Sequence, residues 1–346
     1  MRPASPKELG RWDEFVVANP DGGQILQTRA WGEFKRKHRW APRYLLSENQ
    51  PPMAVLELRH PVPGLGVLGY IPKGPGVSDL GQLPAVVEGL RATAGSAFAI
   101  KVEPEIEQST EATAALGAMG LEKSRHDVQI SRATIIVDIR PDEDALLASF
   151  KPKCRYNIRL AQRRGVTVVP VPLEDESIAT MYSLMASTRD RAGFTLRSKE
   201  YFSQYWHLHA AAGQGQLFFA SLNGEVLAGV FATYLGRKAW YKDGGSTKEH
   251  AAVMAPHLLQ WEVMRWLRSR GVEAYDLVAV PPAADLNPAH PLYGLYRFKS
   301  GFSERITEYV GTWDLPIRRR RHAAWNVVAE RAAHQWAYRV RHDLLY

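Results

Sequence analysis

The sequence predicts an α+β protein that consists of two tandem domains, each built on a mixed, mostly antiparallel sheet. Three observations support this prediction. The 346 residues are too many for one ordinary core and suit two domains of about 150 residues each. One order of helices and strands occurs twice along the chain. Short turn signals join the strand-like segments, as is typical of antiparallel hairpins.

We expect domain 1 at residues 1–140 and domain 2 at residues 141–316. A basic C-terminal helix at residues 317–346 should pack back on domain 1. Domain 1 runs from two helices through antiparallel strands to a further helix and strand. Its successive segments are RWDEFVVANP, QILQTRAWGEFKRK, PPMAVLELRH, LGVLGYIPKGP, LPAVVEGLRATAG and AFAIKVEPE.

The second copy repeats this order with clearer local signals. Asn223 and Gly224 lie between apolar runs, which is the strongest short hairpin signal, and Gly236 supplies a second turn. The helix that follows opens at Pro256 and ends before Gly271. Its apolar face is formed by Leu258, Trp261, Val263, Met264 and Leu267. This spacing predicts a helix with one buried side.

The connecting segment PDEDALLASFKPKCRYNIRLAQRRGVTVVPV predicts two short helices that lead into a strand. Acidic residues open the first helix, and Gly165 follows the second. Arg155, Arg159 and Arg163 recur every four residues, so they should form one ribbon on the surface of the second helix.

The positive charge is concentrated in two segments. The net charge is +8, and residues 151–165 hold six Lys or Arg residues and no acid. Residues 317–346 hold seven Arg residues against Glu330 and Asp343. Positive charge concentrated in this way favours a polyanionic partner, although either segment alone could be a solvated helix face.

Composition excludes several classes of protein. The single cysteine, Cys154, excludes an internal disulfide and a cysteine-built metal site. No His or carboxylate residues show metal-ligand spacing, so we expect no metal and no cofactor. No apolar run approaches the ~18 residues of a membrane span, and no secretory signal is evident. We therefore expect a cytoplasmic monomer.

The repeated element order is that of a GNAT-like (acyl-CoA N-acyltransferase-like) domain, present twice. A CoA enzyme of this kind needs a glycine-rich turn at a helix N-terminus to hold the pyrophosphate. That turn is missing, because YKDGGSTKEHAAVMAPHLLQ places its glycines well upstream of the helix. Gly74 and Gly76 do not replace it, since Pro75 lacks a backbone donor. We therefore expect an acyl donor other than CoA.

An ordered set of motifs resembles the Fem (FemABX) family of peptidoglycan bridge-forming aminoacyltransferases over nearly the whole chain. The motifs are QTRAWGEFK, YIPKGP, RYNIRLAQRRGV, FTLRSKEYF, WYKDGGS, YDLVAV and PLYGLYRFKSGFSERITEYVGTWDLPI. The resemblance implies two GNAT-like domains that move an amino acid from aminoacyl-tRNA to the side-chain amine of residue three in a peptidoglycan precursor. The acceptor would be UDP-MurNAc-pentapeptide or lipid II. This chain looks like the shorter members, which lack a helical-arm insertion.

The resemblance also implies which residues bind the precursor. Lys35 would face the diphosphate, although a solvent-facing lysine beside Arg36 is the alternative. The family pattern Thr-x-Arg-x-x-x-Tyr implies phosphate and sugar contacts, with Arg as a bidentate anchor. The remaining side chains would line the same cleft, unless the tyrosines are ordinary core aromatics. The full set is Lys35, Tyr70, Lys73, Thr195, Arg197, Tyr201 and Tyr241.

Lys299 is the strongest catalytic candidate. The family uses a Phe-Lys pair at this position, here Phe298 and Lys299, at the donor end. A fixed cation would stabilise the negative charge on the ester oxygen in the tetrahedral transition state. The alternative is a structural pair with Glu304. Glu103 lies where the family often has an aspartate, which makes it the candidate base, and Asp276 is interpreted as structural.

The basic segments fit an RNA donor. Their arginines would hold the tRNA acceptor arm by its phosphates, and the set is Arg155, Arg159, Arg163, Arg164, Arg318 and Arg319. In the C-terminal helix, an apolar stripe of Ala329, Ala332, Trp336 and Val340 should pack on the protein. That region could instead rest on anionic lipid at the inner face of the plasma membrane.

The leading hypothesis is a tRNA-dependent aminoacyltransferase of peptidoglycan synthesis. The same chemistry on a small peptide or lipid is one alternative. A CoA-dependent N-acetyltransferase is another, and the missing pyrophosphate turn opposes it. A non-catalytic nucleic-acid binder would explain the arginines but not the YRFKSGF segment.

Overall fold

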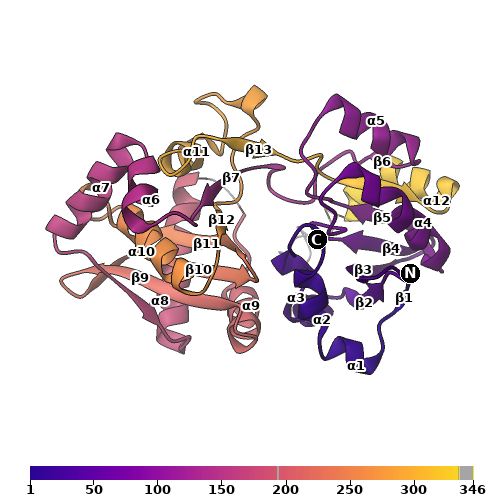
Figure 1. The fold of residues 1–346 in the computed structure, drawn as a ribbon, viewed down its shortest axis with the longest axis horizontal. Helices are drawn as coiled ribbons and strands as arrows, with labels where there is room; N and C mark the ends of the chain where they lie inside the picture. Colours follow the sequence, from indigo (N-terminus) through magenta and orange to yellow (C-terminus); the bar gives the residue numbers. More distant parts are fainter. Residues whose placement is uncertain (193–194, 334, 336–345) are drawn as a thin grey trace. The chain divides into compact units, whose positions relative to one another are not determined.

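The computed structural model describes residues 1–192, 195–333, 335 and 346, and its contacts divide the chain into two compact units (Figure 1). Unit 1 comprises Met1–Arg132 and Glu308–Tyr346, and unit 2 comprises Ala133–Thr307. These limits differ from the predicted domains, because strand pairing at long sequence separation decides them. Residues 133–138 join the second sheet, whereas residues 313–316 return to the first.

Unit 1 is built on a seven-stranded sheet with the order β1-β2-β3-β4-β5-β14-β6. Among the described strands of this sheet, only β4 and β5 pair in parallel, and all other neighbours pair in an antiparallel direction. The strands are β1 (Arg2–Pro3), β2 (Ala41–Leu46), β3 (Ala54–Val62), β4 (Gly66–Ile71), β5 (Ala97–Val102), β6 (Glu122–Lys123) and β14 (Trp313–Pro316). The helices are α1 (Pro6–Leu9), α2 (Trp12–Val17), α3 (Arg29–Lys37), α4 (Leu83–Thr93), α5 (Thr110–Ala118) and α12 (Arg319–Ala324).

The core of unit 1 lies between the sheet and helices α4 and α5. Leu83, Val86, Val87 and Leu90 give α4 a buried stripe at helical spacing, which packs against Ile100 and Val102 of β5 among others. Ser109 caps the N-terminus of α5 through its side chain, and Thr28 does the same for α3.

Unit 2 is built on a second seven-stranded sheet, with the order β13-β7-β12-β11-β10-β9-β8. Its strands are β7 (Ala133–Asp138), β8 (Thr167–Val171), β9 (Gly215–Leu222), β10 (Glu225–Leu235), β11 (Lys238–Ser246), β12 (Ala274–Asp276) and β13 (Ile306–Glu308). Its helices are α6 (Glu143–Ser149), α7 (Pro152–Arg163), α8 (Asp175–Ala192), α9 (Lys199–Ala211), α10 (Ala255–Ser269) and α11 (Tyr293–Lys299).

Helices cover both faces of the second sheet because alternate residues of β10 point to opposite sides. Val230 and Ala232 belong to the core that α10 completes, whereas Phe231 contacts Tyr205 and Trp206 of α9. The predicted hairpin is confirmed at Asn223 and Gly224. Both have positive φ, at 51° and 86°, as a two-residue type I′ turn requires.

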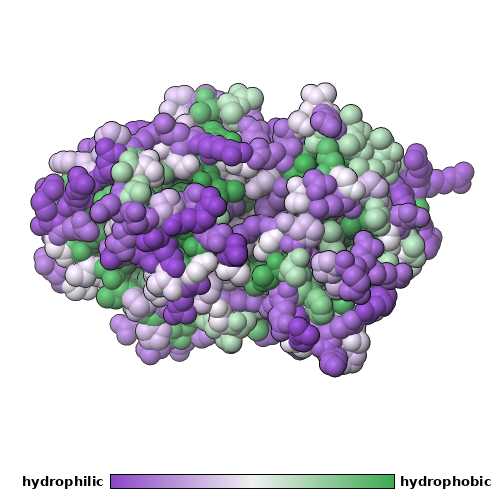
Figure 2. Space-filling view, in the orientation of Figure 1, coloured by the Kyte–Doolittle hydropathy of each residue, from purple (hydrophilic) through white to green (hydrophobic). Residues whose placement is uncertain are grey.

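The described part of residues 317–346 packs on unit 1. The backbone N–H of Arg318 donates to the carbonyl of Phe98, and the Trp325 ring lies 5.8 Å from the Phe98 ring. A π-helical segment at Trp325–Ala329 follows α12. Trp336 and Val340 of the predicted stripe lie outside the described residues. On the face drawn in Figure 2, most side chains are hydrophilic.

Candidate active site

Each unit contains a parallel strand pair, and the predicted catalytic residues Glu103 and Lys299 lie near the carboxyl ends of these pairs. In unit 1, β4 and β5 remain paired up to Ile71 and Val102, and Glu103 is the next residue. In unit 2, β11 and β12 remain paired up to Trp240 and Asp276, and Tyr241 follows. Ligands of open sheets with parallel strands bind at such ends, so both places suit chemistry.

Lys299 lies just beyond the carboxyl end of β12. It ends α11 and is only 4% exposed. Its Nζ donates hydrogen bonds to the carbonyls of Val278, at 2.8 Å, and Ala279, at 3.0 Å. The same atom lies 5.7 Å from the centre of the Tyr241 ring. The predicted alternative is wrong, because Glu304 pairs with Lys151 at 2.7 Å.

The turn that receives Lys299 is strained. Val278 has φ of 57°, a left-handed conformation that a β-branched residue rarely adopts. Its N–H donates to Asp276 Oδ1 at 2.6 Å, and its carbonyl accepts from Lys299. Asp276 and Lys299 therefore bind the backbone N–H and the carbonyl of Val278, respectively. This contact of Asp276 fits the structural role expected for it.

Burial changes the acid–base behaviour of Lys299. It lowers the pKa of the ammonium to about 7, although the carboxylate of Asp276 acts in the opposite direction. Burial, together with Asp243, raises the pKa of Tyr241 to about 12, so its hydroxyl stays protonated at neutral pH. Lys299 can thus supply a cation near pH 7 in a site where little water competes for its charge.

Phe298 supports the lysine by packing. It is half-buried against the core of unit 2, with its ring 5.1 Å from His257 and 5.5 Å from Phe302. Burial, together with Lys153, lowers the pKa of His257 to about 4, so this imidazole is neutral at pH 7. Its Nε2 lies 3.1 Å from Asn157 Nδ2 of helix α7.

Glu103 is the centre of a polar cluster in unit 1. Its side chain is 4% exposed, and Oε2 accepts from the Tyr70 hydroxyl at 2.7 Å and from the Lys73 N–H at 3.3 Å. Oε1 accepts from Thr312 Oγ1 at 2.7 Å. Gln129 Nε2 lies 2.9 Å from the Tyr70 hydroxyl. These partners are all uncharged donors, which leaves the negative charge of Glu103 without a direct ion pair among them.

A small pocket opens beside this cluster. Its lining includes Lys73, Glu103, Asp127, Arg132 and Tyr309. Lys73 Nζ lies 3.5 Å from Glu105 and 5.2 Å from the centre of the Tyr309 ring. The structure therefore brings together three of the predicted residues, Tyr70, Lys73 and Glu103. Burial, with help from Glu103, raises the pKa of Tyr70 well above its usual range.

Lys35 differs from its neighbours in α3. It is only 3% exposed, whereas Arg36 and Lys37 face solvent. Its Nζ lies 5.4 Å from the centre of the Trp31 ring. The alternative of a solvent-facing lysine is wrong, because an amphipathic helix turns this position toward the protein.

Thr195, Arg197 and Tyr201 gather at the N-terminus of α9. The guanidinium of Arg197 lies 4.4 Å from the centre of the Tyr201 ring. Ser198 caps the helix by accepting from the Tyr201 N–H, and the Tyr182 hydroxyl donates to the Arg197 carbonyl. Thr195 is exposed. Helix N-termini favour anions, so this group suits phosphate.

The arginines of helix α7 are not equivalent. Arg159, Arg163 and Arg164 are exposed. Arg155 is half-buried instead, and its guanidinium donates to the carbonyls of Ala148 and Phe150 at the end of α6. Its predicted RNA contact is therefore weakened, because the side chain already holds two helices together.

Arg318 and Arg319 are exposed in unit 1, whereas the arginines of α7 belong to unit 2. The Arg318 guanidinium donates to the carbonyl of Gly95 at 3.2 Å. The arginines of unit 1 and those of unit 2 therefore form two separate basic surfaces.

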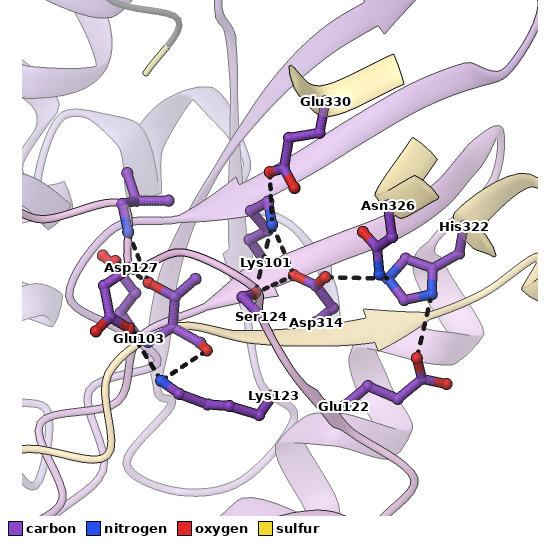
Figure 3. Close-up of polar contacts among 12 residues, drawn as sticks. Lys101, Glu103, Glu122, Lys123, Ser124, Asp127, Asp314, His322, Asn326 and Glu330 are labelled. Atoms are coloured by element: carbon purple, nitrogen blue, oxygen red, sulfur yellow. Dashed lines mark hydrogen bonds and ion pairs between the residues drawn. The ribbon is translucent and has the colours of Figure 1, made fainter. Parts of the chain in front are cut away.

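A buried ionic network beside the unit 1 pocket was not predicted (Figure 3). Lys101 Nζ lies 2.9 Å from Asp314 and 3.1 Å from Glu330, and the sheet pairs Lys101 directly with Asp314. His322 Nε2 lies 3.0 Å from the second oxygen of Asp314. Burial opposes the charge of Asp314, but His322 and Lys101 outweigh it and lower its pKa to about 2. The sequence feature that could have indicated this network is the single lysine, Lys101, inside the apolar strand AFAIKV.

The described residues contain neither a cluster of possible metal ligands nor a helix that could span a membrane. Among the residues that the structure describes, no group of three or more His, Cys, Asp or Glu side chains is arranged to hold a metal ion. Within the same residues, no helix is long and apolar enough to cross a membrane.

The two sheets, each with a parallel strand pair among antiparallel neighbours, define a tandem GNAT-like fold. A family model described as an acetyltransferase (GNAT) domain matches residues 148–300. A solved structure of FemX has a TM-score of 0.81 with 23% sequence identity, covering 95% of this chain and all of that one. The structure of L-PGS from Bacillus licheniformis has a TM-score of 0.54 at 17% identity, over 95% of this chain and 97% of that chain.

Sequence relatives narrow the class further. A lipid II:glycine glycyltransferase of Staphylococcus aureus strain MRSA252 is 26% identical over 87% of this chain and 90% of the relative. The alignment spans 383 positions, more than the 346 residues here, so the relative carries segments that this chain lacks. In sequence and fold the chain is similar to the Fem (FemABX) family of aminoacyl-tRNA-dependent transferases, as its motifs predicted.

Proposed function

We propose that this enzyme transfers an amino acid from aminoacyl-tRNA to the side-chain amine of residue three in the stem peptide of a peptidoglycan precursor. The single observation that carries the proposal furthest is the buried ammonium of Lys299 just beyond the carboxyl end of β12. The acceptor of the S. aureus relative, which is named for lipid II, supports a precursor of the same class.

The reaction needs little from the protein beyond positioning and charge. The acceptor amine attacks the ester carbonyl, a C–N bond forms, and negative charge collects on the carbonyl oxygen. The C–O bond to the tRNA ribose then breaks, the ribose hydroxyl leaves and the amine loses one proton. Lys299 stabilises the oxyanion through a donor that its two carbonyl partners hold in place.

Glu103 is the proposed base for the departing proton. Its carboxylate is buried. The groups that donate hydrogen bonds to it are all uncharged, namely the Tyr70 hydroxyl, the Lys73 backbone N–H, the Gln129 amide and the Thr312 hydroxyl. One lone pair of Oε1 remains beside the bond from Thr312, so the carboxylate could accept a proton without breaking its contacts.

Phosphate binding is proposed for Arg197 and Tyr201 in unit 2 and, separately, for Lys35 in unit 1. Arg197 and Tyr201 already contact one another at a helix N-terminus, which favours phosphate oxygens. Both substrates of such a reaction are made in the cytoplasm, so the proposed location is cytoplasmic. With a lipid-linked acceptor the enzyme would act at the inner face of the plasma membrane.

CoA-dependent acetyl transfer is the second candidate, because residues 148–300 match an acetyltransferase domain. The helix that would hold a pyrophosphate opposes it. Helix α10 begins at Ala255, directly after Met254, which has φ of 61°, and carries Pro256 in its first turn. This N-terminus therefore lacks the run of free glycine N–H groups that cradles a pyrophosphate.

The test is transfer of labelled amino acids from total charged tRNA to four acceptors. These are UDP-linked precursor, lipid-linked precursor, phosphatidylglycerol and a free dipeptide. Parallel reactions contain RNase or replace charged tRNA with labelled acetyl-CoA. We expect label in a peptidoglycan precursor, at the third residue, and none after RNase treatment.

Other outcomes overturn the proposal. Label in phosphatidylglycerol or the dipeptide alone would keep the tRNA donor and discard the cell-wall acceptor. Transfer from acetyl-CoA that resists RNase would favour the second candidate.

A further inference from the structure

Helix α7 presents a tyrosine at the centre of its solvent-facing side. The buried face of this helix consists of Cys154, Asn157, Ile158 and Ala161. At 100° per residue, Tyr156 projects from nearly the opposite side. Its side chain is 49% exposed, one of the few large apolar side chains on the described surface. Burial therefore gives no reason for an aromatic residue here.

Cations flank this tyrosine on its own helix. Lys153 Nζ lies 4.7 Å from the centre of the Tyr156 ring, and the guanidinium of Arg163 lies 5.9 Å from it. Arg159 is exposed one turn along the same side. Residues 151–165 contain no acid. In Figure 2 the end of unit 2 where Figure 1 places α7 is predominantly hydrophilic.

An exposed aromatic ring among cations is the arrangement that binds unpaired nucleotides. The ring stacks on a base, and the neighbouring cations bind the flanking phosphates. Duplex RNA offers phosphates but no accessible base face, so the ring adds nothing to duplex binding. An anionic lipid surface would instead call for several apolar side chains on one face, and α7 presents a single aromatic residue.

We propose that Tyr156 is a stacking platform for an unpaired nucleotide of RNA, with Lys153 and Arg163 on the adjoining phosphates. The inference rests on the proposed function and extends it. The amino acid of aminoacyl-tRNA is carried on a single-stranded 3′ end, and this site discriminates that end from the duplex stem. Arg155 is not part of the site, because its guanidinium binds the end of α6.

The test measures RNA binding by fluorescence anisotropy with two probes. One is an RNA hairpin with a single-stranded 3′ extension, and the other is the same hairpin with a blunt end. The variants are Tyr156→Ala, Tyr156→Phe and Arg163→Ala. Gln162→Ala is the matched control, because Gln162 is exposed on the same helix but lies to one side of Tyr156.

Tyr156→Ala should weaken binding of the extended hairpin roughly ten-fold and leave the blunt hairpin unchanged. Tyr156→Phe and Gln162→Ala should bind both probes like the wild type. Arg163→Ala should weaken both probes and reduce the slope of log affinity against log salt by about one.

Equal effects of Tyr156→Ala on both probes, or no effect on either, would overturn the stacking site. So would tight binding of wild-type protein to phosphatidylglycerol vesicles that Tyr156→Ala abolishes. Failure of the proposed function looks different. If the proposed function is wrong, the wild type will not transfer amino acids from charged tRNA. If only the stacking site is wrong, the wild type will transfer them and Tyr156→Ala will do so at the same rate.

Discussion

At the scale of single residues, the chemistry of Lys299 depends on its neighbours more than on its own identity. Two backbone carbonyls and the Tyr241 ring fix the position of Nζ. Burial lowers its pKa to about 7. A lysine on the surface would be charged throughout the physiological range, whereas this one loses its charge close to neutrality.

This pKa gives the enzyme a defined pH dependence. If the charged form stabilises the oxyanion, kcat should fall as the pH rises through about 7. Lys299→Arg keeps a permanent charge, so any activity that this variant retains should lack that alkaline limb. Initial rates of transfer between pH 6 and 9, at saturating acceptor, measure both profiles. An identical limb in both enzymes would assign the titration to another group.

The residue scale also separates what the sequence could and could not reveal. Lys299, Phe298 and Glu103 are predicted from motifs. In the structure Glu103 directly follows β5, the Lys299 ammonium binds the backbone just after β12, and Phe298 packs on the core of unit 2. The carbonyl partners of Lys299 could not be predicted, because they depend on the left-handed turn at Val278. Tyr156 was passed over because an exposed tyrosine has no sequence signature until the buried face of its helix is known.

At the scale of elements, Gly245 shows how closely helix α8 approaches strand β11. A Cβ at Gly245 would lie 2.4 Å from the backbone of Leu184, which cannot move without moving the helix. By contrast, Gly117 in α5 is exposed, and a Cβ there meets nothing within 4 Å. The same substitution should thus have opposite effects at the two positions.

We expect Gly245→Ala to destabilise the protein by about 2 kcal/mol or more, as overpacking does. Gly117→Ala should stabilise it by up to about 1 kcal/mol, because alanine favours the helix. Chemical denaturation monitored by circular dichroism measures both changes. Equal stability of the two variants would show that α8 and β11 are less tightly packed than the structure indicates.

The C-terminal elements are held on unit 1 by charge as well as by packing. Lys101 is 1% exposed and neutralises both Asp314 and Glu330. Lys101→Met would leave two buried carboxylates without their cation, so we expect a loss of about 3–5 kcal/mol in unfolding free energy. Lys151→Met removes an exposed pair and should cost at most about 1 kcal/mol. Similar small losses in both variants would contradict the network's importance.

Local signals predicted the elements well, and long-range pairing explains where the prediction failed. Asn223 and Gly224 marked a real hairpin, and Gly271 follows the end of α10. The domain limits were misplaced because β14 pairs with β5, more than 200 residues earlier. No local pattern in TWDLP reports that partner, although Asp314 within it is buried and charged.

At the scale of the whole molecule, the two units repeat one architecture but use it differently. Each contains a parallel strand pair. In unit 1 the carboxylate of Glu103 follows this strand pair. In unit 2 the ammonium of Lys299 lies near the carboxyl end of the corresponding pair. The two copies of the scaffold thus carry groups of opposite charge near the carboxyl ends of their parallel strands.

The central claim is that Lys299 stabilises the transition state of aminoacyl transfer. The most direct test is the single-turnover rate of transfer from aminoacyl-tRNA to the precursor, for wild type and Lys299→Ala, with tRNA affinity measured in parallel. The account predicts a rate roughly 10²–10³-fold lower in the variant, with unchanged tRNA affinity and a native circular dichroism spectrum. A folded Lys299→Ala enzyme that transfers at the wild-type rate would contradict it.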